Sequence, residues 1–421
     1  MRFQSSISSP VVRNAAWMLY GQGGRLVLQA AYFIVLARTL GVSEFGVLAA
    51  TAALAAIFGT FSGMGSGDVL VMRVARQPAV YPVYFGNALL TTVVSSLPLG
   101  VLFAATAAWM LPGTASTTLI VGLIVSEFIF ARCMEQCAQA FVALDRHRYT
   151  AHIFFLMSAA RATGAVVFMS AGGSTAEQWI LWLVALNGLA MIATVWITIT
   201  MLGRPRTEPW RALREIRHGV HFSIGLGAKT VYSDIDKAML GRLATFEAAG
   251  TYTAAYRLVA MAFVPVSAVL YAGASRFFRM GEKGVVSALQ WGRRLLPFAI
   301  GYGVVVAVGI YLGAPLIPMI LGDDYVGSVE VLKWLSVLPV LQALHFVLAD
   351  TLTGANLQYV RSTIQIAVAA FNVGLCYWLI GAHGIMGACW AALASESVLA
   401  VSMTIAILYA RNKQYSREAT A

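Results

Sequence analysis

The sequence predicts an all-α polytopic membrane protein, with about twelve transmembrane helices in two six-helix lobes. Its composition, the spacing of its apolar runs and an internal repeat lead to this prediction. Of the 421 residues, 59% are hydrophobic and 11% are charged, and the mean hydropathy is +0.76. Soluble domains carry about 25% charged residues. Lipid rather than water is therefore expected to surround most of the chain.

Apolar runs of the length needed to cross a bilayer, about 20 residues, recur along the whole chain. The first run is too long for the apolar segment of a signal peptide, so we expect it to be a retained helix. An even number of spans places both termini on one side of the membrane. The expected spans are 14–37, 43–64, 83–109, 116–141, 150–171, 177–201, 219–241, 246–271, 295–320, 330–353, 361–381 and 384–410.

The basic residues indicate the orientation of these spans. Most of the 29 Lys and Arg residues fall in loops on the N-terminal side, whereas Arg38, Arg242 and Lys333 fall on the other side. Because short cytoplasmic loops are enriched in Lys and Arg, both termini are predicted to be cytoplasmic. Apolar spans interrupt the basic loops, which excludes a continuous groove for nucleic acid.

An internal repeat relates the two halves of the chain. A displacement of about half the chain length places Arg25 on Lys229, Leu36-Ala-Arg38 on Leu240-Gly-Arg242, and Gly46 on Gly250. Six spans in each half give the halves the same topology, related by a pseudo-twofold axis along the membrane normal. Rocking two such lobes around a central cavity would expose that cavity to one side at a time. A repeat kept only for packing is the alternative.

The chain therefore divides into an N-terminal lobe, a linker and a C-terminal lobe. The segment 207–218 places Trp210, Leu213 and Ile216 at helical spacing with arginines between them, which is typical of a helix lying in the membrane interface. We expect a cytoplasmic interfacial linker there. The expected boundaries are 1–202, 203–218 and 219–421, the last including a short polar tail.

Two stretches resemble a known family. The segment Leu36-Ala-Arg-Thr-Leu-Gly-Val-Ser-Glu-Phe-Gly46 is similar to the region between the first two helices of polysaccharide export proteins. These are the O-antigen flippase-like members of the multidrug/oligosaccharidyl-lipid/polysaccharide (MOP) flippase superfamily. The segments Asp236-Lys-Ala-Met-Leu-Gly-Arg-Leu and Gly250-Thr-Tyr-Thr-Ala-Ala-Tyr-Arg257 resemble the seventh and eighth helices of that family.

The resemblance implies a MATE-like two-lobe bundle in a bacterial inner (cytoplasmic) membrane. The implied activity is that of a flippase moving a polyprenyl-pyrophosphate-linked oligosaccharide to the external leaflet, for use in polysaccharide or exopolysaccharide biosynthesis. The implied partners are the lipid-linked oligosaccharide, the bilayer and the polysaccharide polymerase or export machinery. No cofactor is expected.

Basic residues within the spans are the candidates for substrate binding, because a cation at the bilayer centre is costly and faces the bundle interior. Arginine and lysine also suit a pyrophosphate, the first through bidentate hydrogen bonds and the second as a compact charge. Arg25 shares one helix face with Gln22 and Gln29. Internal ion pairing is the alternative role for each cation, and Glu135 is expected to pair with Arg132 one turn away. The candidates are Arg25, Lys229, Arg161, Arg257, Gln22 and Gln29.

Acidic residues in the spans are candidates for binding a driving ion. Asp236 and Asp234 lie on the seventh span and Glu396 on the twelfth. A buried carboxylate can bind a proton or a sodium ion, although each is also suited to be the structural partner of a base.

Other function classes fit the sequence less well. A multidrug or cation antiporter of the same superfamily would share the two lobes, but a cationic substrate calls for carboxylates where basic residues dominate here. A polysaccharide polymerase or glycosyltransferase would usually need a substantial external loop carrying catalytic groups. The sequence has no GxSxG motif, no paired metal ligands and no phosphate-binding Gly-Lys-Ser/Thr loop. We therefore do not expect an enzyme or a metal site.

Overall fold

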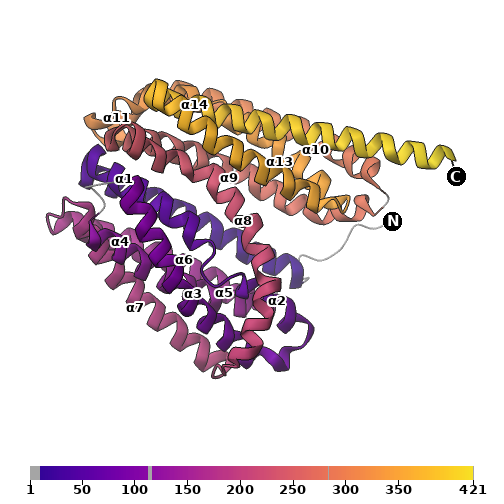
Figure 1. The fold of residues 1–421 in the computed structure, drawn as a ribbon, viewed down its shortest axis with the longest axis horizontal. Coiled ribbons are helices and arrows are strands. Elements are labelled where there is room, and N and C mark those ends of the chain that lie inside the picture. Colours follow the sequence, from indigo (N-terminus) through magenta and orange to yellow (C-terminus); the bar gives the residue numbers. More distant parts are fainter. Residues whose placement is uncertain (1–9, 112–115, 283, 421) are drawn as a thin grey trace. The chain divides into compact units, whose positions relative to one another are not determined.

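The computed structural model describes residues 10–111, 116–282 and 284–420, without the side chains of 10–22, 221, 267–275 and 417–420. Within these residues the chain is a succession of helices (Figure 1). The helices group into two compact units, unit 1 (Met1–Gly227) and unit 2 (Ala228–Ala421). The chain passes from one unit to the other inside a single helix, α8 (Pro209–Leu243).

Helical stretches in the described residues correspond to all twelve predicted spans. The first two spans form α1 (Pro10–Gly59), which is two helices joined at Gly41, and the last two form α14 (Gln358–Thr420), joined at Gly384. Both glycines have positive φ, which glycine adopts without the steric cost that a Cβ imposes. The remaining bounds are α2 (Ser66–Arg76), α3 (Tyr81–Met110), α4 (Thr117–Leu123), α5 (Arg132–Ala143), α6 (His147–Ser170), α7 (Ala176–Leu202), α9 (Phe246–Gly281), α10 (Val285–Gly313), α11 (Ile317–Leu321), α12 (Ser328–Leu335) and α13 (Leu338–Gly354).

Eight of these stretches are long and apolar enough to cross a membrane, among the residues described. Two of the eight contain the glycine joints of α1 and α14. The long helices α8 and α9 lie outside this set, and α8 carries Lys229, Asp234, Asp236 and Lys237. The seventh span is thus the most polar of the predicted spans, and its charges must find partners inside the protein.

Local signals in the sequence set several helix ends. The Ser116, Thr175 and Thr245 hydroxyls accept hydrogen bonds from backbone N–H groups three residues ahead, at 3.1, 3.3 and 3.0 Å. Each bond satisfies one of the N–H groups that a helix start leaves without a partner. Between α1 and α2 the helix is interrupted by Gly63 and Gly65, both with positive φ.

A π-helix (Ile124–Ala131), η2, joins α4 to α5 and carries Glu127. The π-geometry widens the turn, so backbone carbonyls lose their usual helical alignment. The Phe128 carbonyl oxygen accepts hydrogen bonds from the Ser62 hydroxyl at 2.7 Å and the Ser96 hydroxyl at 2.9 Å. The turn before α2 and the helix α3 thereby stabilise this segment.

Helix α8 differs from the predicted linker. The residues 203–208 are not helical, but Pro209 begins a helix that continues without interruption to Leu243. Trp210 and Leu213 are exposed, as predicted for an interfacial surface. The predicted interfacial helix thus continues directly into the seventh span, because a change from polar to apolar sequence does not by itself end a helix.

Each unit has an apolar core and an apolar outer surface. In unit 1, α2, α3 and α5 pack around Leu70, Phe85 and Phe141, and in unit 2, α13 and α14 pack around Leu352, Leu399 and Met403. Large apolar side chains such as Trp109 and Tyr377 are exposed and suit contact with lipid. The protein is a multi-pass membrane protein.

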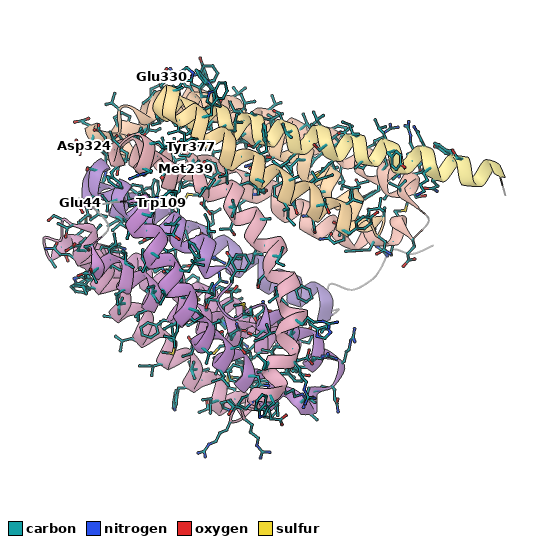
Figure 2. All side chains as sticks on the ribbon, viewed as in Figure 1. Glu44, Trp109, Met239, Asp324, Glu330 and Tyr377 are labelled. Carbon is teal, nitrogen blue, oxygen red and sulfur yellow. The ribbon has the colours of Figure 1, made fainter. Side chains whose placement is uncertain are left out.

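The acidic residues labelled in Figure 2 lie at one end of each unit. In unit 1, Glu44 lies at the same end as Trp109, and in unit 2, Asp324 and Glu330 lie at the same end as Tyr377. The Glu44 carboxylate accepts a hydrogen bond from the Ala176 N–H at 2.8 Å, so it fixes the start of α7.

The first testable consequence concerns the close approach of α8 to the turn before α2. A Cβ on Gly219 would lie 2.1 Å from the Met64 carbonyl oxygen, whereas a Cβ on Gly225 of the same helix would meet no atom within 4 Å. Gly219→Ala is expected to lower the free energy of unfolding by about 1–3 kcal/mol, the usual cost of overpacking. Gly225→Ala should raise it by up to about 1 kcal/mol through helix propensity. Chemical unfolding in detergent measures both; equal effects would contradict the argument.

Candidate functional site

Arg25 on α1 is a half-buried base of unit 1. Its guanidinium lies 5.3 Å from the ring centroid of Phe154 on α6, which is within the range of a cation–π contact. It interacts electrostatically with Arg161 and Glu135, but among the described residues it forms no salt bridge. A half-buried cation without a carboxylate partner is suited to bind an anion that enters the membrane region.

Arg161, a second predicted binding residue, is paired inside unit 1. Its Nη2 lies 2.7 Å from the Glu127 Oε1 of the π-helix. Next to it, the Ser126 hydroxyl accepts a hydrogen bond from Asn187 Nδ2 at 2.7 Å. The structure thus gives Arg161 the structural role that the sequence left open, while retaining its position beside Arg25.

The predicted pair of Arg132 with Glu135 is confirmed, with 2.6 Å between Nη1 and Oε2. Both residues line a polar cavity in unit 1. The Gln136 amide on the same wall donates to the Thr92 hydroxyl at 3.2 Å, while its buried oxygen has no partner among the described residues. The other lining residues are Thr60, Ser62, Gly65, Gly67, Asp68, Gln139, Phe222, Ser223 and Leu226.

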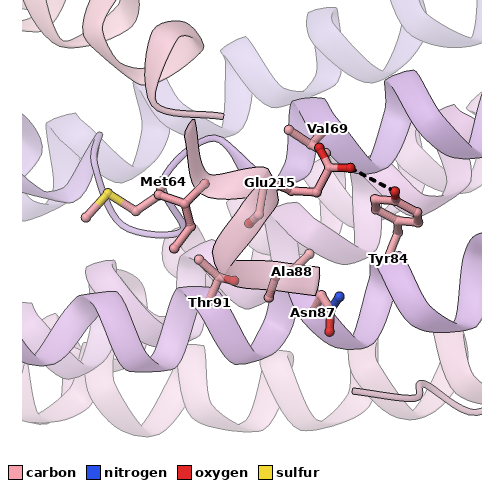
Figure 3. Close-up of a pocket in the computed structure, with 10 residues that line it drawn as sticks. Met64, Val69, Tyr84, Asn87, Ala88, Thr91 and Glu215 are labelled. Carbon is pink, nitrogen blue, oxygen red and sulfur yellow. Dashed lines mark hydrogen bonds between the residues drawn. The ribbon is translucent and has the colours of Figure 1, made fainter. Parts of the chain in front are cut away.

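A second pocket of unit 1 is more apolar and lies where the start of α8 packs against α2 and α3 (Figure 3). Glu215 closes it: its Oε1 lies 2.9 Å from Arg73 Nη2 and accepts a hydrogen bond from the Tyr84 hydroxyl at 3.0 Å. Arg211, one turn earlier, lies over the Tyr84 ring at 4.9 Å. These contacts hold the start of α8 against α2 and α3. The residues that line this pocket therefore have a structural role, and we do not assign the pocket to substrate binding.

In unit 2, Lys229 is exposed on α8, and its Nζ lies 5.6 Å from the Phe346 ring centroid. It forms no salt bridge among the described residues. Arg257 on α9 is exposed and interacts electrostatically with Lys237. Arg25 and Lys229, which the internal repeat pairs in sequence, thus share one structural feature: each lies over a phenylalanine ring within its own unit.

Of the two candidate amide side chains, Gln29 and Gln22, the structure describes only that of Gln29. Gln29 is half-buried on α1. The side chain of Gln22 lies outside the described residues, although its backbone is helical.

Asp234 and Asp236 surround a buried lysine. Lys237 Nζ lies 2.7 Å from Asp234 Oδ1 and 3.5 Å from Asp236 Oδ1, and it also contacts the Ser233 carbonyl oxygen. The Tyr252 hydroxyl donates to Asp236 Oδ2 at 2.5 Å. Both predicted ion-coupling carboxylates are thus committed to Lys237 and Tyr252, which is the structural alternative that the sequence left open.

Glu396, the third predicted ion-coupling residue, contacts a histidine of another helix. Its Oε2 lies 2.6 Å from Nδ1 of His345 on α13, and both side chains are buried. The sequence places His345 and Glu396 in apolar spans, but the two residues are far apart along the chain and on different helices. Helical spacing therefore could not predict that they meet. The packing of α13 on α14 brings them together.

These features define a class: a two-unit helical membrane protein with two bases in its spans, Arg25 and Lys229, that form no salt bridge with the residues described here. The chain belongs to the polysaccharide biosynthesis protein family, whose model matches residues 11–274. The family resemblance predicted from the sequence is thereby confirmed. None of the curated proteins matches the chain.

Solved structures share the fold at low sequence identity. An inward-facing multidrug resistance MATE family transporter of the MOP superfamily has a TM-score of 0.75 at 13% identity, over 94% of this chain and 96% of that one. An outward-facing structure described in the same terms has a TM-score of 0.64 at 15% identity, over 98% and 97%. A MOP superfamily transporter from Pyrococcus furiosus, described as having a binding pocket of reverse polarity, has a TM-score of 0.65 at 14% identity, over 96% and 95%. The predicted MATE-like fold is confirmed.

The pairing of Arg161 with Glu127 gives a double-mutant prediction. Arg161→Gln and Glu127→Gln each leave a partly buried charge without its partner, so both should lower the melting temperature. The double variant should lose less than the sum, with a coupling energy on the order of 1 kcal/mol.

The control is the same cycle at Arg132 and Glu135, which lie one turn apart on one helix. Its coupling should be smaller, about 0.3–0.5 kcal/mol, as for local helix pairs. Additive effects of Arg161→Gln and Glu127→Gln would show that their contact does not stabilise unit 1.

Proposed function

We propose that the protein is a flippase for an anionic lipid-linked saccharide, a polyprenyl-pyrophosphate-linked oligosaccharide, in a bacterial inner membrane. One observation carries the proposal: Arg25 lies half-buried within a span, over Phe154 and without a salt-bridge partner among the described residues. Lys229 in unit 2 is exposed, but it also lies over a phenylalanine ring and forms no salt bridge among the described residues. Membership of the polysaccharide biosynthesis family supports a saccharide as the cargo.

The distribution of partners favours an anion over a cationic drug. The membrane-depth carboxylates Glu127, Glu135 and Asp350 each form a salt bridge with an arginine, at 2.7, 2.6 and 3.6 Å. Asp234 and Asp236 are committed to Lys237. The carboxylates that a cationic drug would need thus already form salt bridges inside the units. Arg25 and Lys229, by contrast, form no salt bridge among the described residues. Reverse pocket polarity is described for one MOP superfamily protein of this fold, so the fold does not require a cation-binding pocket.

Transport would proceed by alternating access, in which the two units expose the bases to one side of the membrane at a time. Arg25 in unit 1 and Lys229 in unit 2 would each bind phosphate oxygens of the pyrophosphate, while saccharide and polyprenyl chain cross with it. Binding energy is gained from charge-assisted hydrogen bonds to the phosphate oxygens.

The decisive test is flipping of a lipid-linked oligosaccharide in proteoliposomes. Arg25→Ala and Lys229→Ala should each reduce the rate at least about tenfold, since losing one charge-assisted contact costs about 1.5–3 kcal/mol. Arg25→Lys should retain much of the activity because it keeps the charge. Arg293→Ala, an exposed arginine on α10, is the matched control and should flip at the wild-type rate.

Two outcomes would overturn the proposal. Wild-type protein that transports a cationic drug but no lipid-linked oligosaccharide would identify an antiporter. Equal flipping by all variants at equal protein level would remove Arg25 and Lys229 from the substrate path.

A second prediction concerns orientation. The proposed cytoplasmic side carries Arg73, Arg76 and Arg146 in its loops, so a reporter fused to the C-terminus should report the cytoplasm. Green fluorescent protein fused there should fluoresce, and alkaline phosphatase fused there should be inactive. The same reporters placed after Arg242 should give the opposite results. Alkaline phosphatase activity at the C-terminus would reverse the proposed topology.

A further inference from the structure

The polar cavity of unit 1 has no part in the proposed function. Its walls come from the turn after α1, from α2, from α5 and from the part of α8 that belongs to unit 1. Asp68, Phe222 and Leu226 are exposed and form its rim. The buried lining side chains form its floor and are Thr60, Ser62, Gln136 and Ser223. The cavity thus places polar groups inside the unit, behind a rim that other molecules can reach.

The hydrogen bonds around Gln136 fix the direction of its amide. The Thr92 hydroxyl donates to the Ala88 carbonyl oxygen at 2.8 Å, so the Thr92 oxygen can only accept from Gln136. The Gln136 amide nitrogen donates to it at 3.2 Å. The amide oxygen then lies on the other side, and it has no partner among the described residues. A buried acceptor without a donor is costly, so this oxygen calls for a donor from outside the protein.

Gly67 of α2 leaves room beside that oxygen. A Cβ at this position would lie 2.7 Å from Gln136 Oε1 and 3.3 Å from Gln139 Cγ, so a larger residue would displace two lining side chains. The Ser62 hydroxyl donates to the Phe128 carbonyl oxygen at 2.7 Å, so it offers lone pairs to other groups. The floor is therefore rich in hydrogen-bond acceptors, which complements a ligand rich in O–H donors.

The charges of the cavity favour a neutral ligand. Glu135 Oε2 and Arg132 Nη1 lie 2.6 Å apart on the wall, so their charges compensate each other. The other lining charge, Asp68, is exposed on the rim, where water and salt screen it. A pyrophosphate would meet two carboxylates and one guanidinium, and a cation would find no net charge on the buried floor. Among the described residues, no group of three or more His, Cys, Asp or Glu side chains could hold a metal ion.

Phe222 adds an aromatic surface to the rim, with 48% of the residue exposed. A sugar ring has hydroxyl groups around its edge and C–H groups on its faces. An aromatic ring can cover such a face through dispersion contacts, while amides and hydroxyls bind the edge. Amide, hydroxyl and aromatic side chains around one cavity therefore match a single sugar ring.

We propose that this cavity binds one sugar of the lipid-linked saccharide, while Arg25 of the same unit binds the pyrophosphate. A sugar hydroxyl donates to Gln136 Oε1, and the face of the ring lies against Phe222. The binding of a sugar stands on the cavity alone, whereas its attachment to a lipid pyrophosphate rests on the proposed function. The neutral and the anionic parts of one cargo thus have separate sites in unit 1.

Equilibrium binding to the full chain in nanodiscs separates the two sites. The probes are polyprenyl pyrophosphate alone and the same lipid carrying one glucose, galactose or N-acetylglucosamine. The wild type should bind at least one sugar-bearing lipid about tenfold more tightly than the bare lipid, as one or two hydrogen bonds allow. Gln136→Met and Phe222→Ala should each remove most of this gain and leave the affinity for the bare lipid unchanged. Arg25→Ala should weaken the binding of both lipids by the same factor.

The controls are Gln77→Met and Phe298→Ala, which alter exposed residues of the same types outside the cavity and should keep the gain. Asp68→Asn should also keep it, because the rim charge is not required. A gain that Asp68→Asn abolishes and tetraphenylphosphonium competes away would identify a cation site and overturn the proposal. An unchanged gain in both Gln136→Met and Phe222→Ala would also overturn it, since the Gln136 oxygen would then bind an ordered water only.

Saturation-transfer NMR with the methyl glycosides of the same three sugars tests the cavity without any lipid. The wild type should show sugar signals that Gln136→Met or, if that variant fails to fold, Phe222→Ala abolishes. Such signals without binding of any lipid would reject the proposed function and leave the sugar site intact. Binding of the bare lipid that depends on Arg25, with no gain from any sugar and no NMR signal, would reject the sugar site alone.

Discussion

The lack of water in the bilayer core is the constraint on which the rest of this structure depends. Every polar group in the spans must find a partner within the protein, because lipid offers none. Hydroxyls illustrate the solution, since many of them donate to carbonyl oxygens one turn earlier on their own helix, as Thr51 and Thr92 do. The Phe128 carbonyl of the π-helix accepts hydrogen bonds from Ser62 in the turn before α2 and from Ser96 of α3. Charged groups follow the same rule through salt bridges.

The lack of water in the bilayer core also makes the bases without a salt bridge informative. Since Arg132, Arg161 and Arg361 all have carboxylate partners, a base that lies over an aromatic ring instead is conspicuous. Arg25 makes a weak cation–π contact with Phe154, and Lys229 makes one with Phe346. An anion that binds either base can replace this contact. A full salt bridge would have to be broken first. Within the described part of the chain, the arrangement in each unit thus holds a cation over an aromatic ring without a salt bridge.

The sequence was sufficient for the architecture and for local contacts. Apolar runs predicted the twelve spans because hydropathy and length are properties of single segments. The pair of Arg132 with Glu135 was predictable because helix geometry alone places residues three apart on one face. Arg161 with Glu127 and His345 with Glu396 were not predictable, since each pair depends on which helices pack together and at what rotation. The continuity of α8 was missed because its polar start and apolar remainder differ in environment, not in backbone conformation.

Helix α8 contains two glycines at the point where it passes from one unit to the other. The division between the units lies at Gly227 and Ala228, and Gly225 and Gly227 stand directly before it. Each glycine makes the helix easier to unwind by about 1 kcal/mol relative to alanine, while Glu215 holds the preceding turns to unit 1. The turns of α8 around Gly225 and Gly227 are therefore the part of this helix that unwinds most easily, and strain along α8 is expected to be relieved there first.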